Sequence, residues 1–407
     1  MREILIMKRL RTIRNINIRQ KRVLLRVDFN EPLKGGKLVD DFRMRSHLPT
    51  IQFLLKQKNS LVIVSHCGRP AFAPTVVGAT VGKPALKIKN GFSLQPMARH
   101  LSQLLNKKVI FVSDPFMGPG LARISRLRSG EIAMIENIRL WKGEEKNDKR
   151  FAKQLTKLGN VFVNDAFSAS HRAHASIVGV TKFLPSYAGL LLEKEITALE
   201  KVASRPKRPF VAVLGGAKIS DKLPLIQKFL HSADGIILGG ALANTLFSVH
   251  GFEVGKSVID TAFKDTGGFY GNQKILLPYD VVVSRRVAEK AKTETKKIGE
   301  VSTSEFILDA GPQTLTLFGK SLAGAKTIVW NGPLGMSDFE TFSSGTIEFG
   351  RMIKKIRAFS VVGGGDTIAV LRRHNLLSGF SHVSTGGGAM LEFLAGKKLP
   401  GIEVLKK

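Results

Sequence analysis

Residues 360–366 read SVVGGGD, a short apolar run that ends in three glycines and a carboxylate. A continuous apolar run of this kind is typical of a parallel strand that is buried on both faces of a sheet. Glycines directly after such a strand let backbone N–H groups approach an anion, and the N-terminus of a following helix attracts the same anion. The stretch therefore predicts a strand, a phosphate-binding turn and a helix. Asp366 alone fits a simple helix N-cap equally well.

The second half of the chain repeats this pattern in residues 211–218 (VAVLGGAK), 235–240 (GIILGG), 327–333 (TIVWNGP) and 382–388 (HVSTGGG). Glycine-rich turns also occur in α/β proteins for packing alone, but their repetition favours a shared nucleotide-phosphate site. The dinucleotide motif GxGxxG is absent, and GFEVGKS at 251–257 has three residues between its glycines where a P-loop has four. We therefore interpret this half as a nucleotide-binding domain that carries neither fingerprint.

The first half has similar apolar runs, at residues 23–30, 61–70, 109–114, 132–139 and 161–167, with helical patterns between several of them. Polar and charged side chains, rather than glycines, follow these runs. Ligands of such sheets bind at the carboxyl ends of the strands. A single arginine there is more often a surface ion pair, but several in one cleft repel each other and favour a bound anion. The side chains so placed are Arg26, Asp28, Asn30, His66, Arg69, Arg139 and Asn164.

The length of 407 residues favours about two domains. The predicted fold class is α/β, with two doubly wound, Rossmann-like domains of mainly parallel sheets joined by a connecting helix and hinge. The helix is expected over residues 186–204, where apolar residues recur at helical spacing. The expected division is an N-terminal domain at 1–187, an interdomain helix and hinge at 188–205, a C-terminal domain at 206–390 and a C-terminal segment at 391–407.

The composition is strongly basic, since 63 Lys and Arg against 32 Asp and Glu give a formal net charge of +31. This charge fits a nucleic-acid partner, an anionic substrate or a basic bias of the source proteome. The basic residues are scattered and only 7% of residues are aromatic, so we expect no specific nucleic-acid partner. No apolar run reaches the ~20 residues of a membrane helix. Cys67 is the only cysteine, which fits a reducing cytoplasm.

Eight blocks in chain order resemble the signature blocks of the phosphoglycerate kinase family: RVDFNEP, SHCGRP, ENIRLWKGEEKND, VNDAFSASHRAHAS, VLGGAKISDK, WNGPLG, VVGGGDT and FSHVSTGGGA. The resemblance extends from about Lys8 to the C-terminus. It implies reversible phosphoryl transfer in glycolysis between ATP and the carboxylate of 3-phosphoglycerate, giving ADP and 1,3-bisphosphoglycerate. It also implies in-line transfer after hinge closure, by an enzyme that is usually monomeric, with the last residues returning to the N-terminal domain.

The resemblance also implies the functional residues. The N-terminal domain is expected to bind 3-phosphoglycerate through Asp28, Asn30, Arg43, His66, Arg69, Arg139 and Arg172. The C-terminal domain is expected to bind ATP or ADP through Gly216, Ala217, Lys218, Lys222, Gly239, Gly240, Gly311, Gly332, Leu334, Asp338, Gly363, Gly364, Gly365, Asp366 and Thr367, with Mg²⁺ held by Asp366. Arg43 and Lys218 are the expected catalytic residues. The acceptor carboxylate is already ionised, so no catalytic base is needed.

Several positions depart from the family pattern. Asp338 stands where a Glu is usual, Ser337 replaces a Phe, and Glu31 replaces a Val. The segment 72–90 is longer than the usual loop. These departures concern nucleotide preference rather than the class of reaction.

Three alternatives remain open at the level of the sequence. A non-catalytic nucleic-acid binder would account for the charge, and a dinucleotide oxidoreductase would share the α/β plan. His171 and His174 are spaced like a metal pair, but no third ligand lies nearby, which favours a structural role.

Overall fold

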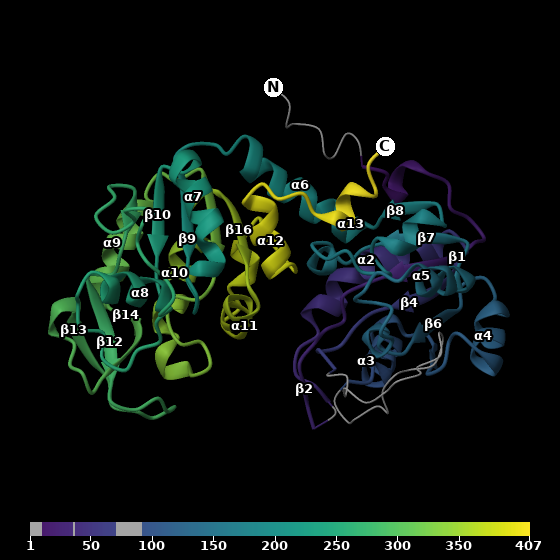
Figure 1. Ribbon diagram of the computed structural model, residues 1–407, viewed down its shortest axis with the longest axis horizontal. Helices are drawn as coiled ribbons and strands as arrows, with labels where there is room; N and C mark the ends of the chain where they lie inside the picture. Colours follow the sequence, from purple (N-terminus) through teal and green to yellow (C-terminus); the bar gives the residue numbers. More distant parts are fainter. Residues whose placement is uncertain (1–9, 36, 71–91) are drawn as a thin grey trace. The chain divides into compact units, whose positions relative to one another are not determined.

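The computed structural model describes residues 10–35, 37–70 and 92–407 (Figure 1). The chain forms two compact units: one holds the residues up to Thr197 together with Lys398–Lys407, and the other holds Ala198–Lys397. The boundary lies within the segment 188–205 that the sequence singles out. The segment that rejoins the first unit begins at 398 rather than at 391, because α12 (Gly387–Leu394) contacts α7 (Leu223–Ser232) of the second unit. The long loop expected at 72–90 lies outside the described residues.

The first unit contains a six-stranded sheet in the order β5-β6-β4-β1-β7-β8, and all its neighbouring strands are parallel. The strands are β1 (Arg22–Arg26), β4 (Ser60–Val64), β5 (Val109–Val112), β6 (Ile132–Ile135), β7 (Val161–Asn164) and β8 (Ser186–Ala188). The helices are α2 (Phe42–Lys56), α3 (Gln95–Leu105), α4 (Gly118–Ser125), α5 (Lys149–Leu155) and the short α13 (Pro400–Glu403), with a small hairpin of β2 (Leu33–Lys34) and β3 (Lys37–Leu38).

Both faces of this sheet are buried, as its continuous apolar strands require. Val23 and Leu25 of β1 belong to one hydrophobic core, together with Met44 of α2 and Leu101 of α3. Leu24 belongs to the core on the opposite face. That second core also contains Ile124 of α4 together with Phe151 and Leu155 of α5. Because side chains alternate along a strand, one run of apolar residues supplies both cores and places helices on both faces.

The connecting helix differs from the expected range 186–204 at its start. Ser186–Ala188 form β8, which pairs with β7 at the edge of the sheet, and α6 begins only at Leu190 and ends at Ser204. The start of α6 is fixed by Asp165, whose Oδ1 accepts hydrogen bonds from the backbone N–H groups of Leu191 at 2.9 Å and Leu192 at 3.3 Å. Asp165 is distant from α6 in the sequence, yet its carboxylate accepts two of the free N–H groups at the start of this helix. The spacing of apolar residues alone therefore misplaces the start of the helix.

The second unit has its own six-stranded parallel sheet, in the order β11-β10-β9-β15-β16-β17. The strands are β9 (Phe210–Leu214), β10 (Gly235–Leu238), β11 (Ile275–Leu276), β15 (Thr327–Asn331), β16 (Phe359–Gly363) and β17 (His382–Val383). The remaining helices are α8 (Ala241–Val249), α9 (Pro312–Leu322), α10 (Ser344–Lys354) and α11 (Gly365–Arg373). Val211 and Trp330 share a core with Phe318 of α9 and Phe349 of α10, whereas the ring of Phe210 packs against Phe229 of α7.

A three-stranded antiparallel sheet in the second unit has no counterpart among the strands expected from the sequence. It consists of β12 (Asp280–Ser284), β13 (Glu294–Lys297) and β14 (Phe306–Ala310), in the order β13-β12-β14. β13 reads ETKK and is mostly exposed, so it lacks the apolar run that identifies a buried strand. Apart from this addition, two doubly wound α/β units with mainly parallel sheets confirm the predicted fold class. None of the helices in the described residues is long and apolar enough to cross a membrane.

Candidate active site

The carboxyl ends of β1, β4, β6 and β7 lie at the same edge of the first sheet, because these strands are parallel. The segments that follow them carry the side chains predicted from the sequence. Arg43 is added to this edge by the first turn of α2. The others are Asp28 and Asn30 after β1, His66 and Arg69 after β4, Arg139 in the 3-10 turn Ile138–Leu140 after β6, and Arg172 after the turn Phe167–Ala169 that follows β7.

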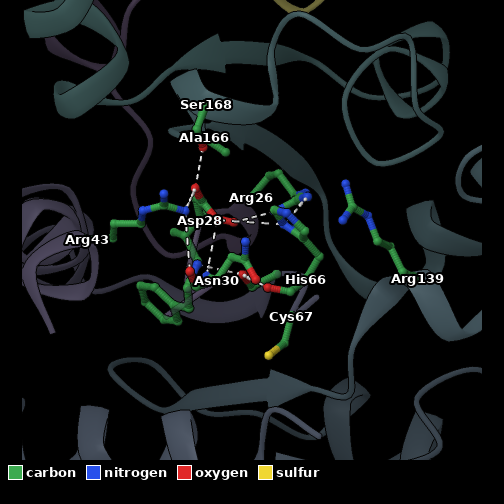
Figure 2. A network of polar contacts seen from close by, with 12 residues as sticks. Arg26, Asp28, Asn30, Arg43, His66, Cys67, Arg139, Ala166 and Ser168 are labelled. Carbon is green, nitrogen blue, oxygen red and sulfur yellow. Dashed lines mark hydrogen bonds and ion pairs between the residues drawn. The ribbon is translucent and has the colours of Figure 1, made fainter. Parts of the chain in front are cut away.

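Asp28 is the centre of this edge, with only 2% of the residue exposed (Figure 2). Its Oδ2 accepts hydrogen bonds from Nη1 of Arg43 at 3.0 Å and from the hydroxyl of Ser168, and its Oδ1 accepts one from the backbone N–H of Asn30 at 3.1 Å. Burial raises the pKa of Asp28, but the charge of Arg43 and the bond from Ser168 outweigh burial and hold the pKa below its usual range. Asp28 is therefore an anion that fixes the guanidinium of Arg43.

The guanidinium of Arg43 is held from one side only. Its Nη1 also donates to the backbone oxygen of Asn30 at 3.3 Å, so both contacts use the same nitrogen, and 28% of the side chain is exposed. A guanidinium has five N–H donors in a planar fork. Arg43 can thus keep its contact with Asp28 and present further donors to an anion in solution.

Arg26, at the end of β1, is buried beneath this edge. Its Nε donates to Oγ of Ser176 at 2.9 Å, and Ser176 in turn donates to Oε1 of Glu144 at 2.6 Å. Nη2 of Arg26 lies 3.3 Å from Nδ1 of His66. Burial, supplemented by the positive charge of Arg26, lowers the pKa of His66 well below its usual value, so His66 is neutral. Its Nδ1 then accepts from Arg26, which leaves Nε2 of His66 as a donor.

The other arginines of this edge are close enough to perturb one another. Arg139 donates through Nη1 to the backbone oxygen of Gly68 at 2.7 Å, and its Nε lies 3.3 Å from Oε1 of Glu145. Burial, together with the charges of Arg26 and Arg172, lowers the pKa of Arg139 to about 10. Arg69 is exposed, and Arg172 is half-buried. Arginine side chains that lie this close together repel one another, and a bound anion would stabilise them. The sequence analysis expected an anion at this edge for the same reason.

The sequence analysis did not identify the buried residues that position Asp28 and the arginine cluster. His47 accepts the backbone N–H of Asp28 at its Nε2, at 3.0 Å, while its Nδ1 lies 2.7 Å from Oδ2 of Asp165. His47 is four residues after Arg43 on α2, so helical spacing could have placed both on one face. Ser168 and Ser176 carried no comparable signal, because their partners are set by the tertiary fold alone.

The second unit has a hollow of about 390 Å³ at the carboxyl edge of its parallel sheet, bounded on its other side by β14. Six predicted nucleotide-binding residues line it: Gly216, Ala217, Gly240, Leu334, Asp338 and Asp366. The remainder of the lining is mainly apolar and includes Val281, Phe306 and Met336. An apolar hollow with a few polar groups at its edge suits a flat aromatic base joined to a charged phosphate chain.

Backbone geometry explains why glycines surround this hollow. Gly216, Gly332 and Gly364 have φ values of +106°, +96° and +98°, which other residues rarely adopt. A Cβ atom on Gly332 would also lie 2.2 Å from the backbone oxygen of Gly215. The turns after β9, β15 and β16 therefore require glycine for their backbone conformation, and at Gly332 for space as well.

Lys222 lies beneath these turns and is 8% exposed. Its Nζ donates to the backbone oxygen of Gly215 and lies 3.4 Å from that of Asn331. Burial lowers the pKa of Lys222 to about 8, although the carboxylates of Asp221 and Asp366 oppose the shift. A partly desolvated cation directly under a glycine turn is a strong attractant for a phosphate.

The remaining predicted nucleotide-binding residues do not line the hollow directly. Lys218 is exposed just beyond the β9 turn, while Gly239 packs against Leu334 and Gly311 against the carboxylate of Asp280. Gly363 and Thr367 are buried on either side of Gly364, and Gly365 is the first residue of α11.

One carboxylate of the hollow escaped sequence reasoning. Asp309 of β14 lines the hollow, and it accepts the N–H groups of Gly345 at 2.7 Å and Ala310 at 2.9 Å. Burial raises its pKa to about 7 in spite of these two bonds. Asp309 was missed because the antiparallel sheet that carries it was not predicted.

Comparison with known proteins decides the family. Residues 13–397 match the family model described as phosphoglycerate kinase. The chain belongs to the phosphoglycerate kinase family. It is therefore a kinase, a transferase of phosphoryl groups that acts in glycolysis, as the ordered sequence blocks implied.

Relatives that align with this chain over nearly their whole length support this assignment. A phosphoglycerate kinase from Coprothermobacter proteolyticus is 43% identical over 98% of this chain and 99% of its own length, and one from Pelotomaculum thermopropionicum is 41% identical over 97% and 98%. The solved phosphoglycerate kinase of Pyrococcus horikoshii matches with a TM-score of 0.84 at 33% identity, covering 97% of this chain and 98% of that one. The Coxiella burnetii enzyme matches with a TM-score of 0.79 at 40% identity and the same coverage.

Proposed function

We propose that the chain transfers a phosphoryl group reversibly between ATP and the carboxylate of 3-phosphoglycerate, giving ADP and 1,3-bisphosphoglycerate. The observation that carries this proposal is the pair of complementary sites at the carboxyl edges of the two parallel sheets. One site is an arginine cluster organised by Asp28, and the other is a glycine-lined hollow of about 390 Å³. The family assignment supplies the names of the substrates.

The first unit is proposed to bind 3-phosphoglycerate. Its ligands would be Arg43, Arg69, Arg139 and Arg172, with Asn30 and the neutral His66 as polar contacts. Planar guanidinium groups bind carboxylate and phosphate through two parallel hydrogen bonds, which suits a small dianionic substrate. Asp28 is almost fully buried, and we propose that its main contribution is to orient Arg43.

The second unit is proposed to bind ATP or ADP. The adenosine would occupy the apolar part of the hollow near Leu334 and Asp338, and the phosphates would lie over Gly216, Lys222 and the N-terminus of α11. Positive partial charge at a helix N-terminus and free backbone N–H groups favour a phosphate there. Lys218, Gly239, Gly240, Gly311, Gly332 and the segment 363–367 complete the proposed nucleotide site.

Asp366 fits the requirements of a Mg²⁺ ligand. It is an exposed carboxylate in the first turn of α11 and lines the hollow. No group of three or more His, Cys, Asp or Glu in the described residues could hold a metal without further ligands. This suits Mg²⁺, which proteins commonly bind through one or two carboxylates and the substrate's phosphates. When bound, Mg²⁺ would neutralise charge on the phosphates of the nucleotide.

The proposed chemistry is positioning and charge neutralisation. The attacking carboxylate needs no base, so Arg43 and Lys218 would act by stabilising charge on the group in transfer. Because these residues belong to different units, closure of the two units about the hinge at α6 would bring them to the same phosphoryl group and exclude water. Exclusion of water matters because an acyl phosphate hydrolyses readily.

The chain is further proposed to act as a cytoplasmic monomer. The lone cysteine supports a reducing compartment. The large hydrophobic side chains that are exposed in the described residues are scattered along the sequence, from Val39 to Leu317, which supports a monomeric state.

A trapping assay tests the acceptor group as well as the reaction. The protein is incubated with ATP, Mg²⁺ and 3-phosphoglycerate, and ADP formation is followed through a coupled enzyme. Hydroxylamine in a parallel sample converts an acyl phosphate to a hydroxamate, whereas a phosphate ester on the substrate's hydroxyl group does not react. We expect ADP and hydroxamate in equal amounts. ADP without hydroxamate would exclude the carboxyl acceptor, and no ADP in either sample would refute the proposed reaction.

A further inference from the structure

A second, larger hollow lies in the antiparallel sheet of the second unit, at the loop that connects β12 to β13. Its volume is about 930 Å³, and it shares no lining residue with the glycine-lined hollow. Five cationic side chains line it: Arg285, Arg286, Lys290, Lys292 and Lys296. Two carboxylates, Glu294 and Glu305, complete the charged lining. The proposed phosphoryl transfer uses none of these groups.

Lys296 is the direct ion-pair partner of both carboxylates, and the charge of Arg285 also acts on Glu305. Lys296 donates to Oε1 of Glu305 at 2.9 Å, and its Nζ lies 3.7 Å from Oε2 of Glu294. Within the described part of the chain, the other four cations of the lining take part in no ion pair. The neighbouring Glu289 is not part of the lining, and its carboxylate accepts hydrogen bonds from the backbone N–H groups of Glu340 and Thr341. The hollow therefore has a net positive charge.

The loop that presents these cations is held in place by its own hydrogen bonds. Ser284, which is 5% exposed, donates from Oγ to the backbone oxygen of Lys292 at 2.9 Å and accepts the N–H of Arg286 at 3.2 Å. The strands below it are paired on both sides of β12. A fixed loop lowers the entropic penalty of binding, because less ordering is required when the ligand arrives.

The lining also restricts the chemistry of the occupant. Apart from the charged residues it contains Val283, Ser284, Ala288, Ala291 and Thr293, and no aromatic side chain. Proteins that bind single-stranded nucleic acid combine basic grooves with aromatic platforms for the bases. Several unpaired cations without such a platform are suited to a chain of phosphate groups and offer nothing to a base.

We propose that this basic hollow binds linear polyphosphate, an anion of three or more linked phosphate groups. The binding is electrostatic and independent of phosphoryl transfer, and each exposed contact contributes modestly. The two hollows are adjacent in the sequence. Arg286 and Ala288 line the basic hollow, whereas Val287, which lies between them in the sequence, lines the glycine-lined hollow of the proposed adenosine site.

The test is a calorimetric titration of the full chain with inorganic tripolyphosphate in Mg²⁺-free buffer, with ADP in excess to occupy the other hollow. The hollow variant carries Arg285→Gln, Arg286→Gln and Lys290→Gln. The control variant carries Lys320→Gln, Lys326→Gln and Lys355→Gln, which removes the same charge from exposed positions elsewhere in the second unit. We expect the hollow variant to bind about tenfold more weakly than wild type and the control variant to stay within about twofold.

The remaining outcomes overturn the proposal. Equal weakening in both variants would mean that tripolyphosphate responds only to net charge. Binding of tripolyphosphate that is seen without ADP and lost in excess ADP would place it in the other hollow. A single-stranded oligothymidylate of matched charge that binds more tightly than tripolyphosphate, and loses that affinity in the hollow variant, would make the occupant a nucleic acid instead.

Discussion

At the scale of single residues, the first unit depends on how Asp28 holds Arg43. The contact is an ion pair of 3.0 Å between a buried carboxylate and a partly exposed guanidinium. Asp28 is 2% exposed, so little water competes with Arg43 for its carboxylate, and the ion pair keeps its orientation.

Replacement of Arg43 should lower catalytic activity. We expect Arg43→Ala to lower kcat by more than about tenfold, through loss of charge neutralisation on the transferring group. The matched control is Arg45→Ala on the same helix, where the side chain is 57% exposed and pairs with Asp41. Steady-state kinetics of both variants decide the matter, and equal activity of the two would remove Arg43 from the catalytic residues.

Glu31 should give the stability of the protein a distinct pH dependence. It is 5% exposed and accepts the N–H of Met44 at 3.1 Å, and burial raises its pKa to about 7. In the unfolded chain the pKa of a glutamate is near 4.5. Between these two values the folded state retains a proton that the unfolded state has lost. The free energy of unfolding should therefore fall as pH rises through this window, by on the order of 3 kcal/mol.

Urea unfolding between about pH 5 and pH 8 measures this effect. Glu31→Gln should flatten the pH dependence relative to wild type, because glutamine does not titrate. Glu348→Gln is the control, since Glu348 is 47% exposed and pairs with Arg351 at the surface. Parallel curves for wild type and Glu31→Gln would contradict the assignment.

The residues that the sequence predicted at the site follow strands, whereas the residues that it missed are positioned by contacts between distant parts of the chain. Asn30, His66 and Arg139 follow strands directly, so strand-end logic found them without a structure. Ser168 and Asp309 act through contacts with residues far away in the sequence. Such contacts depend on how elements pack, and no local pattern reports them.

At the scale of elements, the start of α11 combines two adjacent glycines with different requirements. Gly364 has φ of +98°, whereas a Cβ added to Gly365 would have no neighbour within 4 Å. We expect Gly364→Ala to lower the free energy of unfolding by about 1–3 kcal/mol through backbone strain. Gly365→Ala should not lower it, because the added Cβ meets no neighbour and alanine is favoured over glycine in helices. Urea denaturation of both variants tests this, and similar losses in the two would rule out strain as the cause.

Some strands could be predicted from the sequence and others could not, and the difference has a physical reason. Most of the parallel strands were recognised because burial on both faces leaves a continuous apolar run, but the two-residue strand β11 was not. β8 was assigned to the connecting helix because Asp165, rather than the local sequence, sets the start of α6. β13 was missed because its side chains face solvent, so hydrophobicity gave no signal.

At the scale of the whole molecule, the two proposed substrate sites belong to different compact units. In-line transfer needs the reacting atoms about 3–3.5 Å apart. We therefore expect the radius of gyration in solution to be smallest when 3-phosphoglycerate and a non-hydrolysable ATP analogue with Mg²⁺ are both bound. Small-angle X-ray scattering of the free, singly bound and doubly bound protein measures this. A radius of gyration that is identical in all four states would exclude closure.

Residues 398–407 belong to the first unit, and their contacts there are specific. The N–H of Gly401 donates to the oxygen of Ser170 at 2.8 Å, and Nη2 of Arg11 donates to the oxygen of Val404 at 2.8 Å. During translation the ribosome makes all of the second unit before it reaches these residues. The half of the protein that is synthesised first therefore cannot complete its hydrogen bonds until the later half has been synthesised.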